Sequence, residues 1–576
     1  MAIGGELRPG PIKRIIHIMG FPSDLEIAQK ATLQHISKVA GRIGVAEEQL
    51  EYFGRHKAKL PLSLIDEKKI RRSKLVLVTA LSPTPAGEGK TTTSIGLCEG
   101  MNKIGRKAMV VLREPSLGPV FGMKGGAAGG GYSQVVPMED INLHFTGDFS
   151  AIEKANNLLA ALIDNNLQSR TRGLGIDPRT ISWKRVIDMN DRALRNIVIG
   201  LGGTGNGMPR EDGFNITAAS EVMAILCLAN DIEDLKKRLG NIYVGNTIDR
   251  RPIYARDLNA QGAMALLLKD AIKPNLVQTL EGNPAILHGG PFANIAQGVN
   301  SVLATKMGLS LADVVVTEAG FGADLGAEKF FDIKCRAAGL EPHAAVIVAT
   351  IRALRYHGGA DIKEIGVASS DRVRKGLANL GRHIENMALF GVKCVVAINH
   401  FPTDTQEEID LVKAFCMEHD TVAVLAEGFA KGGDGMTALA DAVMETISEG
   451  RSQFKPLYPL DIPVKDKIEK IARAIYRANE VSYSSEALSA LKRIEKLGLD
   501  GLPVCIAKTQ YSFSDDPALR NAPTGHGIHV NDMEIAAGAG FVVPILGKMM
   551  RMPGLPETPA SETMDIDVNG IISGLS

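Results

Sequence analysis

Aromatic residues and cysteines are scarce in this sequence of 576 residues, in which 5% are aromatic, one is Trp and six are Cys. The cysteines lie far apart, and no two of them form a Cys-x-x-Cys pair. This spacing argues against a structural zinc site or a disulfide framework, so we expect buried, small hydrophobic residues. They are Cys98, Cys227, Cys335, Cys394, Cys416 and Cys505.

The chain also lacks net charge, long apolar runs and an apolar signal core near its N-terminus. Lys+Arg and Asp+Glu both total 65, which argues against a protein that coats nucleic acid. No apolar run reaches the roughly 18 residues of a membrane span, and MAIGGELRPGPIKR has no apolar core. We therefore expect a cytoplasmic protein of about two to four domains, with no nucleic-acid or membrane partner.

The most informative stretch is LVLVTALSPTPAGEGKTTTSIGL, residues 75 to 97. Its apolar start predicts a buried strand, and apolar residues after Lys90 recur at helical spacing. A strand, a glycine-rich loop ending in Gly-Lys-Thr and a helix form the arrangement of a phosphate-binding P-loop. Thr84 stands where the usual pattern has Gly, and an ordinary glycine-rich turn is the structural alternative.

We expect this loop to bind ATP. Backbone N–H groups, the helix N-terminus and the Lys90 ammonium would surround the phosphates, and the Thr91 hydroxyl would reach Mg²⁺. The predicted ATP-binding residues are Thr84, Pro85, Ala86, Gly87, Glu88, Gly89, Lys90 and Thr91.

A second predicted strand, residues 108 to 112, ends at Arg113 and Glu114. Ligands bind at the carboxyl ends of strands in doubly wound sheets, so we expect Arg113 beside the P-loop, near a transferring phosphoryl group. A buried Arg–Glu pair is the alternative. The run GMKGGAAGGGY, residues 122 to 132, has too little side-chain bulk for a packed helix or strand. We expect its backbone to fold against a ligand.

These motifs resemble those of the formate–tetrahydrofolate ligase family, the 10-formyltetrahydrofolate synthetases. The resemblance rests on TPAGEGKTTT, REPSLGPVFG and GMKGGAAGGGY, and on NLHFTGD at residues 142 to 148. It continues through WKRV, TEAGFGADLG and VATIRAL and covers the chain from about the P-loop to the C-terminus. Three positions depart from the family pattern, since Arg355 replaces Lys, Asn215 replaces Asp and Phe429 replaces Trp.

The resemblance implies an ATP-dependent ligation of formate to tetrahydrofolate that uses Mg²⁺ and takes place in a homotetramer. In the family reaction ATP phosphorylates formate, and the folate amine then attacks the formyl carbon of formyl phosphate. A requirement for a monovalent cation is left open. The residues expected at the formyl phosphate are Arg113, Glu114, Lys124, Gly125 and Gly126.

The sequence offers candidates for a general base and for a folate pocket. His144 and Asp148 would lie one turn apart in a helix, and both are candidate bases, with a turn stabilised by Asp148 as the alternative. Phe401 and Phe429 each follow an apolar strand, where two aromatic faces, beside Leu425, could hold a pterin ring. Two core phenylalanines are the structural alternative. The predicted catalytic residues are Lys90, Arg113, His144 and Asp148.

Strand and helix patterns alternate along the chain, which predicts an α/β fold. We expect a P-loop NTPase-like, mostly parallel sheet with helices on both faces, and two further α/β domains. The expected nucleotide-binding domain is discontinuous, at residues 1–150 and 300–385. An inserted domain is expected at 151–299, and a C-terminal domain that contributes the folate pocket at 386–576.

Four local predictions complete the analysis. We expect one helix from Ser23 through Ala40, and a turn entering a helix at residues 287–296, where His288 is either catalytic or structural. Lys59 lies in a basic stretch that is expected to be solvated. A Gly-x-Gly-x-x-Gly run at 200–205 hints at a dinucleotide site, but no helix signal follows it, so a mobile loop bordering the active site fits better.

An alternative function from another class is a regulatory ATPase of the ParA/MinD or bacterial tyrosine-kinase type, whose deviant P-loops SPTPAGEGKTTT also resembles. Those switches lack the GMKGGAAGGGY run and a second α/β region that carries aromatic residues. ATP turnover without formate or folate would distinguish such a switch from a ligase.

Overall fold

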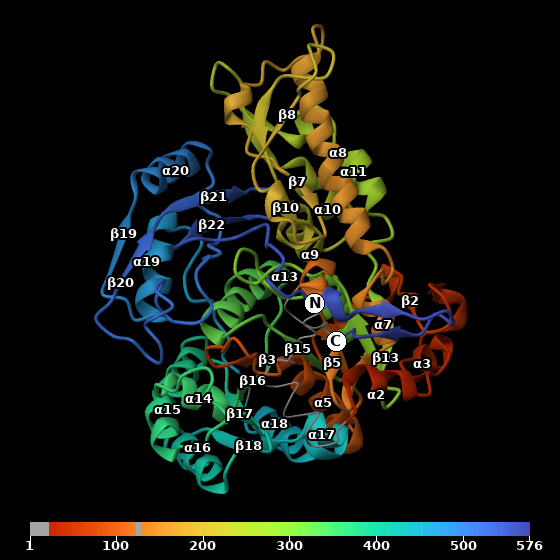
Figure 1. Cartoon of the computed structure of the whole chain (residues 1–576), viewed down its shortest axis with the longest axis vertical. Coiled ribbons are helices and arrows are strands. Elements are labelled where there is room, and N and C mark those ends of the chain that lie inside the picture. The colour runs from red at the N-terminus through yellow and green to blue at the C-terminus, as the bar shows by residue number, and fades with distance from the viewer. Residues whose placement is uncertain (1–21, 123–127, 451, 576) are drawn as a thin grey trace, which may run out of the picture.

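The computed structural model describes residues 22–122, 128–450 and 452–575, and a large sheet forms its centre (Figure 1). The main strand order is β1-β2-β13-β14-β4-β15-β3-β16-β17-β18. Neighbouring strands from β14 to β18 are parallel, whereas β1, β2 and β13 pair antiparallel at one side. The strands are β1 Glu51–Tyr52, β2 Ala58–Lys59, β3 Lys74–Ala80, β4 Ala108–Leu112, β13 Asn275–Thr279, β14 Pro284–Leu287, β15 Val314–Glu318, β16 Ala344–Ala349, β17 Cys394–Asn399 and β18 Val422–Ala426.

Helices cover both faces of the sheet because its central strands are apolar on both sides. Successive side chains of β3 point to opposite faces. Leu75 and Leu77 pack in one core cluster with α12 and α15, whereas Val76 and Val78 pack in another with α5 and α18. The helices span α5 Lys90–Lys103, α12 Val302–Leu311, α15 Ser370–Leu389 and α18 Thr437–Ser448.

Two further regions flank the sheet (Figure 1). The upper one in this view has its own apolar core around α8, α9, α10 and α11. The C-terminal one, drawn in blue, packs two helices against short strand pairs. Their elements are α8 Asp148–Gln168, β7 Arg185–Ile187, β8 Ile197–Ile199, β9 Arg210–Asp212, β10 Phe214–Ile216, α9 Glu221–Leu228, α10 Ile232–Gly240, α11 Gln261–Leu267, α19 Val464–Ala474, β19 Glu480–Tyr483, α20 Ser485–Lys496, β20 Gly527–Val530, β21 Asp532–Ala536 and β22 Phe541–Ile545.

The predicted α/β class with a mostly parallel sheet is confirmed, but the sheet crosses the domain boundaries expected from the sequence. β13 and β14 lie in residues 151–299, and β17 and β18 lie in residues 386–576, yet all four belong to the central sheet. Residues 345–349 of β16 pair directly with residues 394–398 of β17. Backbone pairing along this sheet therefore joins segments that the sequence assigns to three different domains.

Two helix predictions are wrong in detail. Ser23 caps α2 (Asp24–Lys30) with a capping box, but Ala31 is extended and α3 (Ile36–Arg42) begins separately. Residues 288–300 form turns instead of entering a helix, because Gly289 and Gly298 adopt the left-handed conformation, with φ of 68° and 60°.

The Gly-x-Gly-x-x-Gly run is followed by a strand, as the absence of a helix signal suggested. It connects β8 to β9, which pair as an antiparallel hairpin. Figure 1 places β8 near the top of the molecule, far from α5, so this loop does not border the candidate nucleotide loop. Five of the six cysteines are buried, as expected, and Cys394 is half-buried. No helix in the described part of the chain has both the length and the apolar character to cross a membrane.

The Arg355 departure from the family pattern forms a buried ion pair with Glu408. Arg355 Nε and Nη2 donate to the two carboxylate oxygens of Glu408 at 2.8 and 2.5 Å, and both side chains are fully buried. Burial acts to raise the pKa of Glu408. The hydrogen bonds from Arg355, Ser369 and Thr405 outweigh it and hold the pKa at about 2. Two parallel N–H···O bonds are possible for Arg but not for Lys.

We predict that Glu408→Gln lowers the stability at pH 7 by about 3 kcal/mol, because Arg355 loses its buried counter-charge. A carboxylate whose pKa is lowered on folding stabilises the fold above its unfolded pKa, here near 4.5, and this contribution disappears as the pH falls towards about 2. The stability difference between parent and variant should therefore shrink between these pH values. Thermal unfolding at a series of pH values measures it, and a difference independent of pH contradicts the assignment.

Candidate functional site

The carboxyl ends of the parallel strands bring together most of the side chains singled out in the sequence. Arg113 follows β4, Glu318 ends β15, and the glycine-rich loop follows β3. Phe401 follows β17, and Phe429 lies in the short helix α17 (Gly428–Lys431) after β18. Because all these strands run in the same direction, their carboxyl ends meet at one edge of the sheet, where such folds bind ligands.

The loop between β3 and α5 has the backbone geometry of a phosphate cradle. Gly87 and Gly89 adopt the left-handed conformation, with φ of 79° and 75°, and Gly89 is the N-cap of α5. A Cβ atom on Gly89 would lie 2.5 Å from the Asn399 side chain, so the position has no room for one. The Asn399 amide donates to the Glu88 carbonyl oxygen at 3.0 Å. Glycine is thus required both for conformation and for the approach of β17.

Glu88 organises the inside of this loop and explains why Thr84 can replace the usual Gly. One carboxylate oxygen of Glu88 accepts from the Thr84 N–H at 2.8 Å and from the Thr84 hydroxyl at 3.0 Å. The other accepts from the Thr350 hydroxyl at 2.5 Å. Glu88 is only 2% exposed, so these donors replace the water that a carboxylate would otherwise bind.

Glu318 is a site residue that the sequence analysis did not identify. The Thr91 hydroxyl donates to Glu318 Oε2 at 2.9 Å, and Glu318 is 3% exposed. Its strand β15 lies between β3 and β4, so one strand lies between the strand that enters the glycine-rich loop and the strand that precedes Arg113. An acidic residue that directly ends an apolar strand was the sequence signal available for it.

Arg113 therefore lies at the same edge of the sheet but not on the strand next to the loop. Its Nη1 donates to the Pro291 carbonyl oxygen at 3.3 Å, and a Cβ atom on Gly320 would lie 3.3 Å from Nη1. Arg113 Nε is buried and has no hydrogen-bond partner among the described residues. Arg113 and Glu114 do not form an ion pair in the described structure. The half-buried guanidinium thus keeps donor capacity for a ligand.

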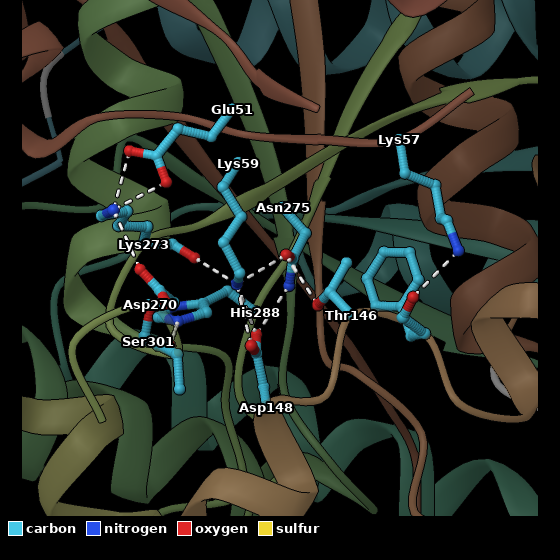
Figure 2. A network of polar contacts seen from close by, with 12 residues as sticks. Glu51, Lys57, Lys59, Thr146, Asp148, Asp270, Lys273, Asn275, His288 and Ser301 are labelled. Atoms are coloured by element: carbon cyan, nitrogen blue, oxygen red, sulfur yellow. Dashed lines mark hydrogen bonds and ion pairs between the residues drawn. The ribbon is translucent and has the colours of Figure 1, made fainter. Parts of the chain in front are cut away.

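A buried polar network joins Lys59, Asp148 and Asn275 (Figure 2). Lys59, expected at a solvated surface, is instead fully buried, with Nζ 2.8 and 3.0 Å from the two carboxylate oxygens of Asp148. Lys59 also donates to Asn275, which donates in turn to Asp148. Burial and the Asp148 and Asp188 carboxylates raise the pKa of Glu114 well above its ordinary value, although Lys59 acts in the opposite direction. These surroundings favour the protonated form of the Glu114 carboxyl.

His288 belongs to the same region, and the structural alternative for it is confirmed. Its Nδ1 lies 2.6 Å from the Ser301 hydroxyl and its Nε2 lies 2.6 Å from the Ala271 carbonyl oxygen (Figure 2). Burial lowers the pKa of His288 to about 4, so the ring is neutral at pH 7. Both ring nitrogens are occupied by protein partners, which leaves no site for a substrate proton.

Of the two alternatives for His144 and Asp148, the helical one is not formed, because the two residues do not share a helix. Residues 143–147 form bends, and α8 begins only at Asp148. Gly147, with φ of 90°, is the N-cap, and the Asp148 carboxylate in the first turn is favoured by the helix dipole. Asp148 is buried against Lys59, whereas His144 is exposed. Of the two candidate bases, only His144 is exposed to solvent in the described structure.

The run at residues 122–132 contacts α17, since the Tyr132 N–H donates to the Phe429 carbonyl oxygen. Lys124, Gly125 and Gly126, expected at the formyl phosphate, lie outside the described residues. Contrary to prediction, Gly129 and Gly130 form the short strand β5, which pairs with β6 (Ser133–Val136). The two strands can pair this closely because Gly129 has no Cβ atom. A Cβ atom there would lie 2.2 Å from the Ser133 carbonyl oxygen, an approach that only Gly allows.

The two candidate pterin-binding rings have different neighbours. The Arg352 guanidinium lies 3.5 Å from the centroid of the Phe401 ring. The Phe429 carbonyl oxygen accepts from Tyr132 N–H at 2.9 Å. A Cβ atom on Gly131 would lie 2.1 Å from this oxygen and 2.8 Å from Cγ of the ring, so Phe429 packs closely against Gly131. Both phenylalanines are half-buried, as is Leu425 in β18. The rings follow neighbouring parallel strands, β17 and β18, and neither is a fully buried core residue.

We predict that Asp148→Asn destabilises the protein by about 3 kcal/mol, since Lys59 would remain buried without its counter-charge. His144→Ala, which changes an exposed side chain, should stay within about 0.5 kcal/mol of the parent. Denaturant unfolding compares the two variants, and the double variant Lys59→Met with Asp148→Leu should recover part of the loss. Equal effects of the two single substitutions would contradict this description of the network.

Comparisons with known proteins identify the family of this chain. The family model described as formate–tetrahydrofolate ligase matches residues 22–576. A protein named formate–tetrahydrofolate ligase from a Sphingobium species is 59% identical over 554 residues, covering 96% of this chain and 99% of its own length. One of the same name from Methylibium petroleiphilum is 58% identical over 559 residues, covering 96% of this chain and all of its own length. This chain therefore belongs to the formate–tetrahydrofolate ligase family.

Proposed function

We propose that this protein ligates formate to tetrahydrofolate at the expense of ATP, giving 10-formyltetrahydrofolate, ADP and phosphate. Family membership over residues 22–576 supports the reaction. The observation that carries the site assignment is the single sheet edge, where the glycine-rich loop, Arg113 and Phe401 follow the strands β3, β4 and β17. One edge thus offers a phosphate cradle, a cation and an aromatic face, as a two-step acyl transfer from ATP requires.

In the first step a formate oxygen attacks the γ-phosphorus of ATP, and the bond from that phosphorus to the ADP oxygen breaks. Residues 84–91 would hold the phosphates through backbone N–H groups and the N-terminus of α5, which begins at Lys90. The Lys90 ammonium would neutralise charge on the transferred group. This assignment makes the β3–α5 unit a P-loop of the NTPase type.

Thr91 and Glu318 are the residues that fit a Mg²⁺ ion bound with ATP. A hydroxyl oxygen and a carboxylate oxygen 2.9 Å apart are hard oxygen donors of the kind that Mg²⁺ prefers. The ion would neutralise phosphate charge during transfer. The bond from Thr91 to Glu318 keeps both groups oriented at the start of α5.

Arg113 and Glu114 would bind formate and the formyl phosphate that forms from it. The guanidinium of Arg113, with its unpartnered Nε, can donate to carboxylate and phosphate oxygens. Burial and the neighbouring carboxylates raise the pKa of Glu114, and in its protonated form Glu114 would not repel the formate anion and could donate a hydrogen bond. We extend the same role to Lys124, Gly125 and Gly126 from the family resemblance alone.

In the second step the secondary amine of tetrahydrofolate attacks the formyl carbon, the bond from carbon to the phosphate oxygen breaks, and the amine loses its proton. Phe401, Leu425 and Phe429 would hold the pterin, since they follow or end adjacent strands at this edge. His144 stays a candidate for the base because it is exposed. Asp148 is committed to Lys59 and fits that role poorly.

The assay for this proposal is formation of 10-formyltetrahydrofolate from formate, ATP and tetrahydrofolate. Turnover that needs all three substrates supports the ligase. Hydrolysis of ATP at the same rate without formate and folate would instead favour the regulatory ATPase. From the resemblance we also propose a homotetramer in the cytoplasm, and sedimentation of the purified protein tests the assembly.

We predict that Lys90→Ala and Arg113→Ala remove different parts of the activity. Lys90→Ala should weaken the use of ATP throughout, whereas Arg113→Ala should slow phosphoryl transfer to formate more than it weakens nucleotide binding. Loss of one charge-assisted contact at a transition state costs on the order of 3 kcal/mol, or about a hundredfold in rate. Turnover by Arg113→Ala within about threefold of the parent would show that Arg113 is not at the acyl phosphate.

A separate prediction concerns Phe429, where the family usually has Trp. Phe keeps a stacking face but has less area than an indole, which weakens folate binding by about 1 kcal/mol or less at ~25 cal/mol per Å². Phe429→Trp should lower the Michaelis constant for tetrahydrofolate severalfold and leave those for ATP and formate unchanged, whereas Phe429→Ala should raise it. If Phe429→Ala shifts all three constants together, or unfolds the protein, Phe429 is a packing residue of the Gly131 contact and not a pocket residue.

A further inference from the structure

One short helix, α14 (Ile351–His357), contacts both ends of the glycine-rich loop. Thr350, its N-cap, donates from its hydroxyl to Glu88 near the end of the loop at 2.5 Å. His357, in its last turn, donates from Nε2 to the Ser82 carbonyl oxygen at the start of the loop, at 2.8 Å. A displacement of the loop relative to the sheet therefore has to break contacts with α14 or move the helix.

The same helix contacts the loop that carries Phe401. The guanidinium of Arg352 lies over the Phe401 ring, 3.5 Å from its centroid. One turn further along, Arg355 Nη2 donates to the Thr403 carbonyl oxygen at 3.1 Å. Two loops from different strands, β3 and β17, are thus attached to one element of seven residues.

Arg352 is the residue of α14 that faces charges from both loops. It is 8% exposed, and its Nε has no hydrogen-bond partner among the described residues. Burial lowers the pKa of Arg352, while the carboxylates of Glu88 and Asp404 act in the opposite direction and Arg355 reinforces the lowering. Asp404 belongs to the Phe401 loop, where its Oδ2 accepts from Phe401 N–H at 2.8 Å. Arg352 is therefore in direct contact with the Phe401 loop through the ring, and it is linked to the glycine-rich loop through Thr350, two residues before it.

We propose that Arg352 is a positioning residue that couples nucleotide binding to folate binding through α14. The inference rests on the folate pocket proposed above. Nucleotide in the loop restricts Glu88, and Glu88 restricts the start of α14 through its hydrogen bond with Thr350, two residues before Arg352. Arg352 in turn fixes the plane of the Phe401 ring. A pterin that stacks on the other face of this ring then loses less conformational entropy on binding. The coupling is reciprocal, because each ligand must favour binding of the other by the same factor.

The test is calorimetric binding of tetrahydrofolate with and without a saturating, non-hydrolysable ATP analogue. In the parent we expect the nucleotide to tighten folate binding about fivefold or more. Arg352→Lys keeps the charge but loses the planar face that covers Phe401, so its ratio of the two dissociation constants should fall to within about twofold of one. A parent ratio near one, or a parent-like ratio in Arg352→Lys, overturns the proposal.

Arg520→Lys is the matched control, because it removes a similar stack from the same helix on another side. The Arg520 guanidinium lies 4.5 Å from the centroid of the Tyr356 ring, and its Nη1 donates to the carbonyl oxygens of Tyr356 and Ala360. This variant should keep the parent ratio. A lost ratio in both variants would mean that general loosening of α14 is responsible, and would overturn the role given to Arg352.

Phe401→Leu separates failure of the coupling from failure of the pocket. It keeps apolar bulk and removes the aromatic face, so folate binding should weaken and the nucleotide effect should disappear, while nucleotide binding alone stays unchanged. If Phe401→Leu binds folate like the parent although the enzyme forms 10-formyltetrahydrofolate, the pocket lies elsewhere and the inference falls with it. If Phe401→Leu weakens folate binding but Arg352→Lys keeps the parent ratio, the pocket stands and only the coupling is wrong.

Discussion

The candidate site depends on one buried carboxylate inside the nucleotide loop. A charged group with 2% exposure is tolerated only when donors replace its water, and Glu88 finds them in Thr84 of its own loop and Thr350 of the next strand. The bonds to Thr84 attach Glu88 to the start of its own loop. The bond from Thr350 attaches the loop to the end of β16, so that the cradle is part of the sheet edge and not a free connection.

Two kinds of buried charge have different consequences in this molecule. In the pairs Lys59–Asp148 and Arg355–Glu408 each charge is neutralised by its partner, and hydrogen bonds to other groups occupy further donors and acceptors. Such pairs fix the relative positions of distant segments. Arg113 and Arg352 each keep an Nε without a partner among the described residues, and both lie at the edge where ligands are expected. Both guanidinium groups thus keep donor capacity at the edge where chemistry is proposed.

Much of the site could be predicted from the sequence because its residues lie next to strong local signals. The apolar runs of β3, β4, β17 and β18 predicted strands, and parallel strands necessarily bring their carboxyl ends to one edge. Glu318 could have been found by the same rule. The order of the strands could not be predicted in this way. The position of β15 between β3 and β4 is decided by how whole helices pack on the sheet. The sequence therefore predicts that Arg113 and the loop share one edge, but not that β15 lies between their strands.

The sequence by itself determined the α/β class, the glycine-rich loop and the family, because these follow from periodicity and from long motifs read along the chain. Only the tertiary structure decided which charged residues are buried. Lys59 lies in a basic stretch and looks solvated, yet Asp148, 89 residues away, neutralises it in the core. His144 and Asp148 are close in sequence, yet Gly147 separates an exposed ring from a buried carboxylate. The physical reason is that burial and charge pairing depend on contacts between distant segments, which no local pattern encodes.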